Sequence, residues 1–352
     1  MTANANRRSI RSLMRKVRRG DKLNILTFAT HERYEENLCK TGHEFYSLRY
    51  GKEWDTSYAE VPQNYHIIDT LPDYVDFDLV LSHTSCNRIE VVHDLLSGTY
   101  GSQTNRISIP ILRHCHVLPD IRFDTKQEIN AFQSIPVDQN SFISDFNKKA
   151  WGCDKGIVIE HGIDTEFWNY DKEAERKNTC LSVVNEWPSR DWCCGFNLWR
   201  ETSGRLPVTV VGKCTGRNEG FSEPARDASH LRQIYQNSRI FYNTSIHSPV
   251  PTVLLEAMAC GCAVVSTETC MIPEIIEHGK NGFISNNKNE LRSFLELLLK
   301  DEDLAKKLGA EARKTICERY GLDPFIEKWN DLLYNTVENY TDTMEVSNES
   351  LS

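Results

Sequence analysis

Short apolar runs alternate with amphipathic stretches from residue 23 to about residue 165. Apolar runs bounded by turn residues predict buried strands, whereas apolar residues three or four apart predict helices. The expected strands are LNILTFATH (23–31), EFYSLRY (44–50), YHIIDTL (65–71), DFDLVLSHT (76–84), ISIPILRHCH (107–116), SFISDF (141–146) and GIVIEHGID (156–164). The expected helices are ERYEENLCKTG (32–42) and NRIEVVHDLLSG (87–98).

A second series of the same kind begins at residue 179. Its expected strands are TCLSVVNEW (179–187), VTVVGK (208–213), IFYNTS (240–245), AVVST (263–267) and GFIS (282–285). Its expected helices are DWCCGFNLWRE (191–201), HLRQIYQNSR (230–239), TVLLEAMACG (252–261), 288–300 and 303–320. Strands that alternate with helices predict a doubly wound parallel sheet, so two series predict two such α/β domains.

The polar stretch EFWNYDKEAERKN (166–178) marks the junction of the two series. The predicted division is a basic segment 1–20, a first domain 21–170 joined by a C-terminal helix 322–340, a second domain 171–321, and a disordered tail 341–352. Ligands of open α/β sheets bind at the carboxyl ends of the strands. The expected site therefore lies there, between the two domains.

Charge is distributed unevenly along the 352 residues, whose formal net charge is −9. Residues 1–22 contain eight Lys or Arg and one acid, a net charge of +7 that leaves −16 for the remainder. An acidic body argues against general nucleic-acid binding. In SIRSLMRKV (9–17), apolar residues at helical spacing oppose arginines, which suits either an amphipathic helix on an anionic membrane, through residues 7–19, or a solvated leader.

Twelve cysteines occur without a CxxC pair or a zinc-finger spacing. The basic N-terminus lacks the apolar stretch of a signal peptide, and no run is long enough to span a membrane. The cysteines are therefore expected to be reduced thiols, and the protein cytoplasmic.

The segment HSPVPTVLLEAMACGCAVV (247–265) places one carboxylate, Glu256, in an apolar run. A buried ionised carboxylate without a partner is costly, so Glu256 is expected to have one, and the partner need not be protein. In the same segment Pro251 suits the first helical turn. The amides of Val250, Thr252 and Val253 could then face a phosphate, assisted by the helix dipole.

Four segments resemble glycosyltransferase family 4, the retaining group 1 enzymes of the GT-B fold. They are GIVIEHGIDTEFW (156–168), IYQNSRIFYNTSIHSPVPTVLLEAMACGCAVVST (234–267), IPEIIEHGKNGFI (272–284) and ERYGLDPFIEKW (318–329). The resemblance extends over nearly the whole chain. It implies two Rossmann-like domains facing a cleft. It also implies transfer of a sugar from a nucleoside diphosphate to a glycan, lipid-linked or other acceptor, without a required metal or other cofactor.

The resemblance also assigns residues. Glu256 matches the second glutamate of the family's E-x7-E motif, which binds the ribose hydroxyls, whereas Ser248 replaces the first glutamate, which contacts the donor sugar or phosphate. The family holds the diphosphate with an arginine and a lysine, whose positions carry Asn185 and Cys194 here.

Other nearby residues are candidates for donor contacts. Arg190 and Lys213 are the best surviving cations, and a departing diphosphate needs such charges. Gly212 ends a strand where a nucleotide could approach the backbone. If these residues do not contact a donor, Arg190 and Lys213 are solvated loop charges, and Gly212 is explained by the geometry of a turn.

The first domain supplies two histidines that share a strand face, His114 and His116. The resemblance implies that a histidine near this point contacts the donor sugar. His116, Arg190 and Ser248 are thus the candidate catalytic residues. His31 and Arg33 follow the first strand and could face the acceptor, whereas His161, Gly162 and Asp164 suit a hinge.

Three other functions remain open. The loss of the first glutamate and of the basic pair would suit a non-catalytic nucleotide- or glycan-binding protein on the same fold. A sugar-nucleotide epimerase would need no acceptor. An oxidoreductase is disfavoured because neither domain's first strand is followed by GxGxxG.

Overall fold

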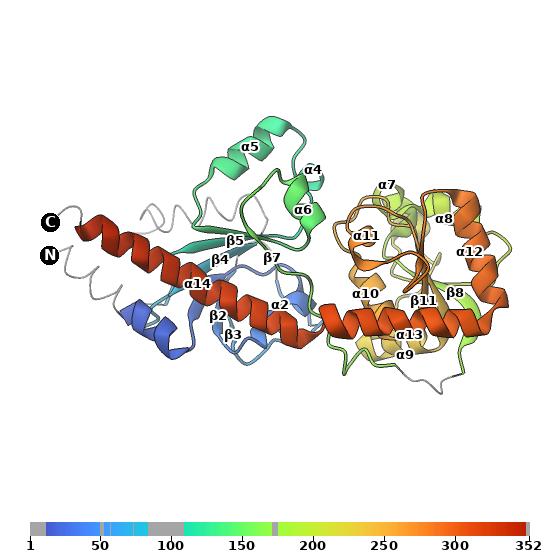
Figure 1. Cartoon of the computed structure of the whole chain (residues 1–352), viewed down its shortest axis with the longest axis horizontal. Coiled ribbons are helices and arrows are strands. Elements are labelled where there is room, and N and C mark those ends of the chain that lie inside the picture. Colours follow the sequence, from blue (N-terminus) through green and yellow to red (C-terminus); the bar gives the residue numbers. More distant parts are fainter. Residues whose placement is uncertain are drawn as a thin grey trace. The chain divides into compact units, whose positions relative to one another are not determined.

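The structure is a computed structural model that describes residues 12–49, 53–56, 58–72, 74–83, 109–170 and 175–349. The chain forms two compact units, unit 1 (Met1–Glu160 and Phe325–Ser352) and unit 2 (His161–Pro324) (Figure 1). The helix expected at 87–98 lies outside the described residues.

Unit 1 contains a parallel sheet with the strand order β3-β2-β1-β4-β5-β6-β7. Its strands are β1 (Asn24–Thr27), β2 (Glu44–Leu48), β3 (Tyr65–Ile68), β4 (Leu79–His83), β5 (Ile111–Cys115), β6 (Gln139–Phe142) and β7 (Ile157–Val158). Its described helices are a helix at residues 12–19, α2 (Glu32–Cys39), α4 (Pro119–Arg122), α5 (Lys126–Ser134), α6 (Asp145–Ala150) and most of α14 (Leu322–Glu349). The order reverses between β1 and β4, which is the switch point of such a sheet.

Alternate residues of the central strands of unit 1 bury opposite faces of the sheet. Leu79 and Leu81 pack in one core cluster, and Val80 between them packs in another. The same alternation separates Ile25 from Leu26 on β1. Both faces are therefore covered, as the continuous apolar runs in the sequence predict.

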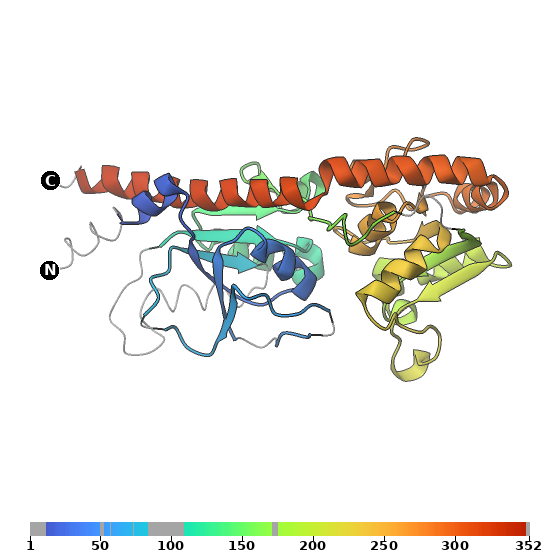
Figure 2. The same cartoon turned by 90° about the horizontal axis from the view of Figure 1, so that it is seen from below.

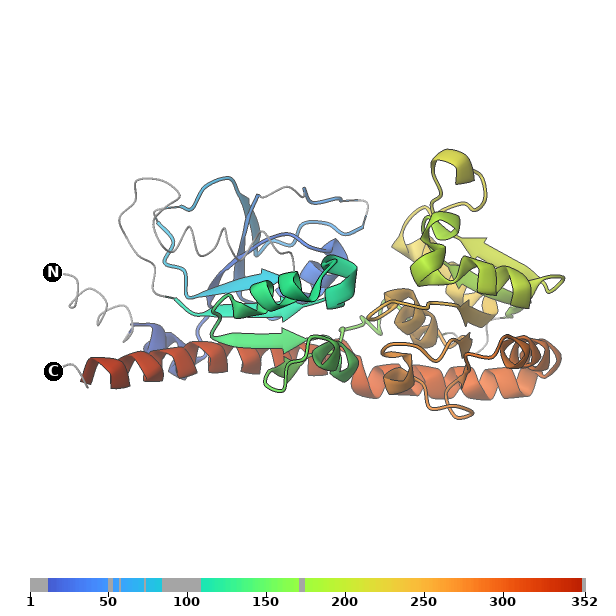
Figure 3. The same ribbon diagram turned by 90° about the horizontal axis from the view of Figure 1, so that it is seen from above.

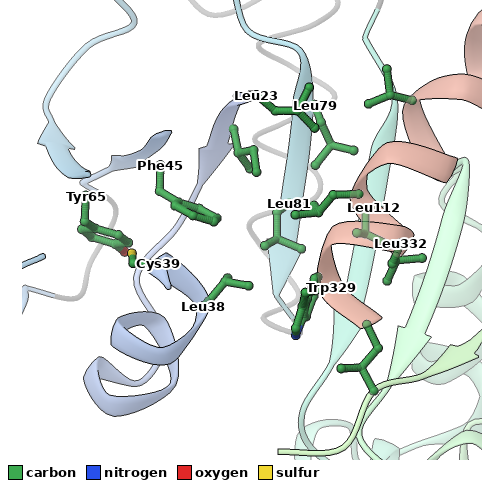
Figure 4. Packing of buried hydrophobic residues seen from close by; sticks show 14 of the residues in the cluster. Leu23, Leu38, Cys39, Phe45, Tyr65, Leu79, Leu81, Leu112, Trp329 and Leu332 are labelled. Atoms are coloured by element: carbon green, nitrogen blue, oxygen red, sulfur yellow. The ribbon is translucent and has the colours of Figure 1, made fainter. Parts of the chain in front are cut away.

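Helix α14 completes the first of these clusters although it follows unit 2 in the chain. Trp329 and Leu332 are buried among Leu81 and Leu112 of the sheet (Figure 4). Views from two further sides show α14 running along one face of the sheet of unit 1 (Figures 2 and 3). Its helical residues continue to Glu349, where a disordered tail from 341 was expected, because no proline or glycine interrupts this stretch.

Residues 12–19 form the expected amphipathic helix. Leu13 is buried in the same core cluster, and Val17 packs against it. Lys16 pairs with the buried Asp78 at 2.7 Å. This apolar face therefore packs against unit 1, and the interpretation as a membrane-inserted face is wrong for Leu13 and Val17.

Unit 2 contains a second parallel sheet with the order β12-β11-β10-β8-β9. Its strands are β8 (Lys177–Val183), β9 (Val208–Val211), β10 (Ser238–Asn243), β11 (Ala263–Ser266) and β12 (Phe283–Ile284). Its described helices are η1 (Trp187–Arg190), α7 (Asp191–Cys194), α8 (Phe196–Ser203), η2 (Gly216–Asn218), α9 (Ala228–Gln236), α10 (Thr252–Ala259), α11 (Ile272–Ile275), α12 (Lys288–Lys300) and α13 (Glu302–Arg319). The order reverses between β8 and β10, so a ligand is expected where these two strands end.

The boundary between the units follows Glu160 rather than residue 170. Arg313 of α13 explains the difference, because its guanidinium donates to the backbone oxygens of Thr165 and Trp168 and ties this segment to unit 2. The Asp164 carboxylate accepts hydrogen bonds from two following backbone amides, which gives it a local structural role.

Among the described residues, no helix combines the length and apolarity needed to cross a membrane. The eleven cysteines in this part of the chain are all free thiols.

Candidate functional site

The loops that follow β8 and β9 are joined by hydrogen bonds. The side-chain oxygen of Asn185 accepts from the backbone N–H of Lys213 at 2.9 Å, and the Glu186 N–H donates to the Lys213 carbonyl at 2.7 Å. The Glu186 carboxylate also accepts from the N–H of Thr215 at 3.2 Å. Arg190 donates to the Asn185 carbonyl at 3.5 Å. The two expected cations, Arg190 and Lys213, are thus exposed on adjoining loops at the carboxyl edge of the sheet.

Gly212 is required by the contact between these loops. A Cβ at this position would lie 2.0 Å from the carbonyl oxygen of Val184. Close packing of Gly212 against Val184 therefore accounts for the glycine by itself, and contact of Gly212 with a nucleotide stays a prediction.

The loop after β8 is also joined to the loop after β10. The carbonyl of Cys193 accepts from the N–H groups of Ile246 and His247 at 2.8 and 3.0 Å. The Thr244 hydroxyl donates to the Cys194 carbonyl at 2.9 Å. Gly195 has φ +64°, and a Cβ there would lie 2.1 Å from the backbone carbonyl oxygen of Thr244. This close approach divides the single helix expected at 191–201 into α7 and α8.

Cys194 occupies the position at which the resemblance implies a lysine. Its side chain is buried, and burial raises the pKa of the thiol to about 12. A neutral, buried thiol packs in the core of unit 2 and offers no charge to a phosphate.

Helix α10 begins at Thr252 with Pro251 as its N-cap, one residue later than a proline in the first turn would require. The first N–H groups of a helix have no intrahelical acceptor and attract anions. Val250 and Pro251 are buried before this turn, whereas Ser248 and Thr252 are half-buried. Phosphate or sugar contacts at these residues stay predictions.

Glu256 is buried on α10, with 4% of its surface exposed. The hydroxyl of Tyr235, from α9, donates to the Glu256 carboxylate at 3.2 Å. The carboxylate therefore has a protein partner, and the need for a partner does not by itself require a ligand. Its contact with ribose hydroxyls stays a prediction.

In unit 1, His114 and His116 have different surroundings. His114 is fully buried, with its Nε2 3.0 Å from the Tyr34 hydroxyl and its Nδ1 2.8 Å from the Ser141 hydroxyl. Both ring nitrogens thus contact protein groups, which favours a structural role over contact with a sugar. His116 is half-buried, and its Nε2 lies 2.7 Å from Nδ1 of His83.

Sequence reasoning missed His83 and Glu35. His83 ends β4, just as His114 lies near the end of β5, and the two residues are paired in the sheet register. Histidines at the ends of successive strands were the available signal for His83. Glu35, which lies 3.4 Å from His83, gave no such signal because it belongs to a helix rich in acids.

Two further predictions concern residues after β1 and metal binding. His31 is exposed and is the N-cap residue of α2, and Arg33 is half-buried.

In the described part of the chain, no group of three or more His, Cys, Asp or Glu side chains could hold a metal ion.

Part of unit 2 is similar to a known protein family. Residues 224–315 match the family Glycosyl transferases group 1, a segment that includes α9, β10, α10 and β11. The N-acetyl-alpha-D-glucosaminyl L-malate synthase of Bacillus anthracis is 32% identical over 89 residues, which are 25% of this chain and 23% of that protein. The probable sucrose-phosphate synthase of Thermosipho melanesiensis is 33% identical over 203 residues, 51% of this chain and 47% of that protein.

The chain therefore matches less than half the length of these two curated relatives. Among solved structures, HepE of Anabaena in complex with UDP-glucose has a TM-score of 0.67 and 14% identity, and the match covers 89% of this chain and all of that one. The two parallel α/β units have the GT-B fold, and the family match supports the group 1 glycosyltransferases.

Proposed function

We propose that this chain is a glycosyltransferase that transfers a sugar from a nucleoside diphosphate to an acceptor. One observation carries the proposal: hydrogen bonds join the loops after β8, β9 and β10 of unit 2 at the switch point of the sheet. This is where open α/β sheets bind nucleotides. The matched group 1 segment includes α10 and its carboxylate.

Each candidate residue then has a specific task. Glu256 accepts hydrogen bonds from the two ribose hydroxyls, since a carboxylate suits adjacent donors. Arg190 and Lys213 neutralise the diphosphate as it departs. His116 and Ser248 contact the donor sugar.

A second group of residues supplies backbone contacts to the donor. The amides of Val250 and Thr252 face the donor phosphates, Pro251 shapes the turn between them, and Gly212 lets the nucleotide approach the backbone. His114 has a structural role in unit 1 rather than a contact with the sugar, because its ring nitrogens contact Tyr34 and Ser141.

The proposed reaction retains the configuration of the anomeric carbon. The acceptor attacks from the face that the diphosphate leaves, and the departing phosphate oxygen takes the acceptor's proton. No metal is required in this scheme, so activity should persist in EDTA. Because HepE was solved with UDP-glucose, this is the first donor to test; glycans and lipid-linked sugars are the acceptor classes.

The test is thermal unfolding of the wild type and Glu256→Ala with UDP, GDP, ADP and their sugar conjugates. A ligand present at 100 times its Kd stabilises the folded state by about 2.7 kcal/mol. We expect stabilisation by one nucleotide that is lost in the variant, followed by turnover to an α-linked product detected by NMR. No stabilisation by any nucleotide would contradict the donor site.

Ser248 stands where the resemblance implies a glutamate, and this difference motivates an alternative function, a non-catalytic nucleotide- or glycan-binding protein. That rival predicts nucleotide-dependent stabilisation without turnover for any acceptor. An epimerase would instead convert the sugar nucleotide when no acceptor is present.

A peripheral contact with an anionic membrane surface, at a cytoplasmic location, is a separate part of the proposal. Arg15, Arg18 and Arg19 are exposed on the helix at 12–19, although Leu13 is buried. The contact would thus be electrostatic, about 1 kcal/mol per basic residue. Co-sedimentation with anionic vesicles should fall in the triple Arg→Ser variant, and equal binding would exclude it.

A further inference from the structure

A pocket in unit 1 has no task in the proposed reaction. Its volume is about 190 Å³, and most of its lining residues belong to β2, to β3 or to the stretch of chain between them. We call it the Trp54 pocket, and its lining includes Ser47, Arg49, Glu53, Trp54, Val61 and Ile67. A site for a complete drug-sized ligand usually measures roughly 300 Å³ or more. The Trp54 pocket therefore suits a single ring of a larger molecule.

A small side chain on β2 opens this pocket in a face of the sheet that is otherwise closed. Phe45 and Tyr65 are paired in the register of β2 and β3, and both are buried in the same core cluster (Figure 4). Ser47 and Ile67 form the next pair on the same face. Serine is too short to continue the core, and Ile67 is left 40% exposed.

The hydroxyl of Ser47 is available to a ligand. Ser47 is only 2% exposed, and with the described residues its hydroxyl makes no hydrogen bond. The oxygen is not one of the side-chain atoms that the protein encloses without a partner, so it reaches the surface of the pocket. A buried hydroxyl favours a hydrogen-bond partner, and a group in the Trp54 pocket can provide one.

Trp54 is fixed in place before any ligand binds. Its indole N–H donates to the carbonyl of Ala59 at 2.7 Å, and its ring packs against the core cluster, 4.8 Å from the ring of Tyr65. The N–H of Asp55 donates to the carboxylate of Glu32 at 3.1 Å, which joins this part of the chain to α2. The indole N–H is already used, so Trp54 offers its aromatic ring rather than a hydrogen bond, and its fixed position lowers the entropic cost of binding.

The charges at the pocket favour a neutral ligand. Arg49 lies 3.4 Å from Asp69, but these side chains are 50% and 76% exposed, so the pair is weak and the guanidinium retains further donors. Glu53 is exposed and supplies acceptors, and its charge disfavours an anion. A purely apolar chain would leave the Ser47 hydroxyl without a partner.

A sugar ring has both kinds of surface that this lining requires. Its hydroxyls donate and accept around the edge of the ring. The C–H bonds on one of its faces carry partial positive charge, which suits the negative face of an aromatic ring. The same C–H face is apolar enough to cover Val61 and Ile67, which are each 40% exposed.

We propose that the Trp54 pocket binds one pyranose ring of a glycan, with a C–H face of the sugar on the indole of Trp54 and a sugar hydroxyl bonded to Ser47. That this glycan is the acceptor rests on the proposed function. The pocket lies on the β2–β3 side of the switch point between β1 and β4. The ring that it holds therefore serves recognition, and a further group of the same acceptor reacts.

The first test needs neither donor nor turnover. In the ¹⁵N-labelled full chain, loss of one indole N–H signal in Trp54→Phe assigns Trp54 among the seven tryptophans. The probes are neutral oligosaccharides of glucose, mannose, galactose and N-acetylglucosamine and, separately, uridine and inorganic phosphate. We expect at least one oligosaccharide to shift the Trp54 signal. A shift by uridine or phosphate alone, or no shift by any probe, would overturn the proposal.

Ser47→Ala measures the proposed hydrogen bond. It should raise the Kd of the bound oligosaccharide about 3- to 10-fold, the usual effect of one hydrogen bond. The midpoint of urea unfolding should not fall, because the hydroxyl has no partner among the described residues. Trp54→Leu keeps an apolar side chain without an aromatic face and should raise the Kd by a similar factor. Unchanged affinity in Ser47→Ala, or a loss of affinity together with a lower midpoint, would contradict the proposal.

Ser82→Ala is the matched control. Ser82 on β4 is also a buried serine of unit 1 whose hydroxyl has no hydrogen-bond partner among the described residues, but the protein encloses this hydroxyl away from the pocket. Its removal should leave the Kd unchanged. Equal weakening in both serine variants would indicate a general effect of losing a buried hydroxyl and would contradict the assignment of the pocket.

The second test separates the Trp54 pocket from the proposed function. With the donor that stabilises the wild type and the oligosaccharide that binds, Ser47→Ala should raise the KM for this acceptor about 3- to 10-fold. Its affinity for the nucleotide should stay within about 2-fold of the wild type, since Ser47 belongs to unit 1. An unchanged acceptor KM would contradict the pocket, whereas sugar binding at Trp54 in a chain that binds no nucleotide would contradict the proposed function alone.

Discussion

The side-chain oxygen of Asn185 accepts the backbone N–H of Lys213 at 2.9 Å. The resemblance implies an arginine at position 185, so this asparagine replaces a charged side chain by one that joins the loops after β8 and β9 through a hydrogen bond. Lys213 lies on the second of these loops, and Arg190 contacts the carbonyl of Asn185. The substitution therefore removes one cation and fixes the loop that carries another.

The first prediction concerns these cations. Arg190→Ala and Lys213→Ala should each weaken nucleoside-diphosphate binding by about 1.5 kcal/mol, the lower range for a bond to a charged group, because both side chains are exposed. Isothermal titration calorimetry measures this change, and added salt should reduce it.

Lys177→Ala is the control for this pair. Lys177 is an exposed cation of the same unit, but it begins β8 and so lies at the opposite edge of the sheet. Its removal should leave affinity unchanged. If all three variants lose affinity equally, the effect is one of net charge, and the placement of the diphosphate is wrong.

The second prediction separates two roles of Glu256. Tyr235→Phe removes the hydroxyl that donates to this carboxylate, which should cost about 1–3 kcal/mol of unfolding free energy. It leaves the carboxylate available to ribose, so nucleotide affinity should fall little. Glu256→Gln should instead lower affinity about 10-fold or more, by 1.5–3 kcal/mol. Urea unfolding and calorimetry on both variants check this, and equal affinities would make Glu256 structural.

The third prediction concerns the contact of Gly195 with Thr244. Gly195→Ala places a Cβ 2.1 Å from the backbone carbonyl oxygen of Thr244, so the loops after β8 and β10 must separate. We expect a loss of about 2–4 kcal/mol in unfolding free energy, combining backbone strain and lost packing.

Gly216→Ala isolates the backbone component of that loss. Gly216 has a similar φ of +62°, but a Cβ there meets no atom within 4 Å. This variant should lose only about 1 kcal/mol. Urea unfolding that finds equal losses would show that the Thr244 contact contributes nothing.

The fourth prediction concerns pH. The pKa of His43 is lowered to about 4, chiefly by burial and to a smaller extent by the charge of Lys22, although the side chain of Asn330 opposes both. The His43 Nδ1 accepts the N–H of Leu23 at 3.1 Å, which requires that nitrogen to be unprotonated. Between pH 6.5 and 4 the unfolded chain therefore binds a proton that the folded chain does not. Stability should fall by up to about 3 kcal/mol as pH drops through this window.

Urea unfolding across this pH range checks the slope. His43→Asn keeps a side-chain acceptor and cannot titrate, so its stability should depend less on pH than that of the wild type. An NMR titration in which His43 protonates near pH 6.5 would contradict the prediction.

Much of the fold could be predicted because parallel strands buried on both faces appear as short apolar runs. The order of the strands could not, since it depends on which runs pair. Gly195 shows a similar limit: the pattern around it is helical, but its contact with Thr244 ends the helix. The N-terminal helix was predicted from its periodicity, yet the partner of its apolar face was not.

The candidate site divides in the same way. Glu256 was found because a charge in an apolar run is conspicuous along the sequence. Its partner Tyr235 lies on another helix and gave no signal. Glu35 and His83 are far apart in the chain, and only the adjacency of β4 and β5 brings His83 to His116.

The return of α14 to unit 1 sets an order of folding during synthesis. Unit 2 is continuous in sequence, whereas unit 1 lacks Trp329, Leu332 and Leu333 until the end of the chain is made. At roughly 5–20 residues per second, Phe325 is synthesised about ten to thirty seconds after Glu160. During that interval Leu81 and Leu112 remain uncovered by α14, so the nascent first half is the species that needs chaperone protection, and unit 2 can finish folding before it.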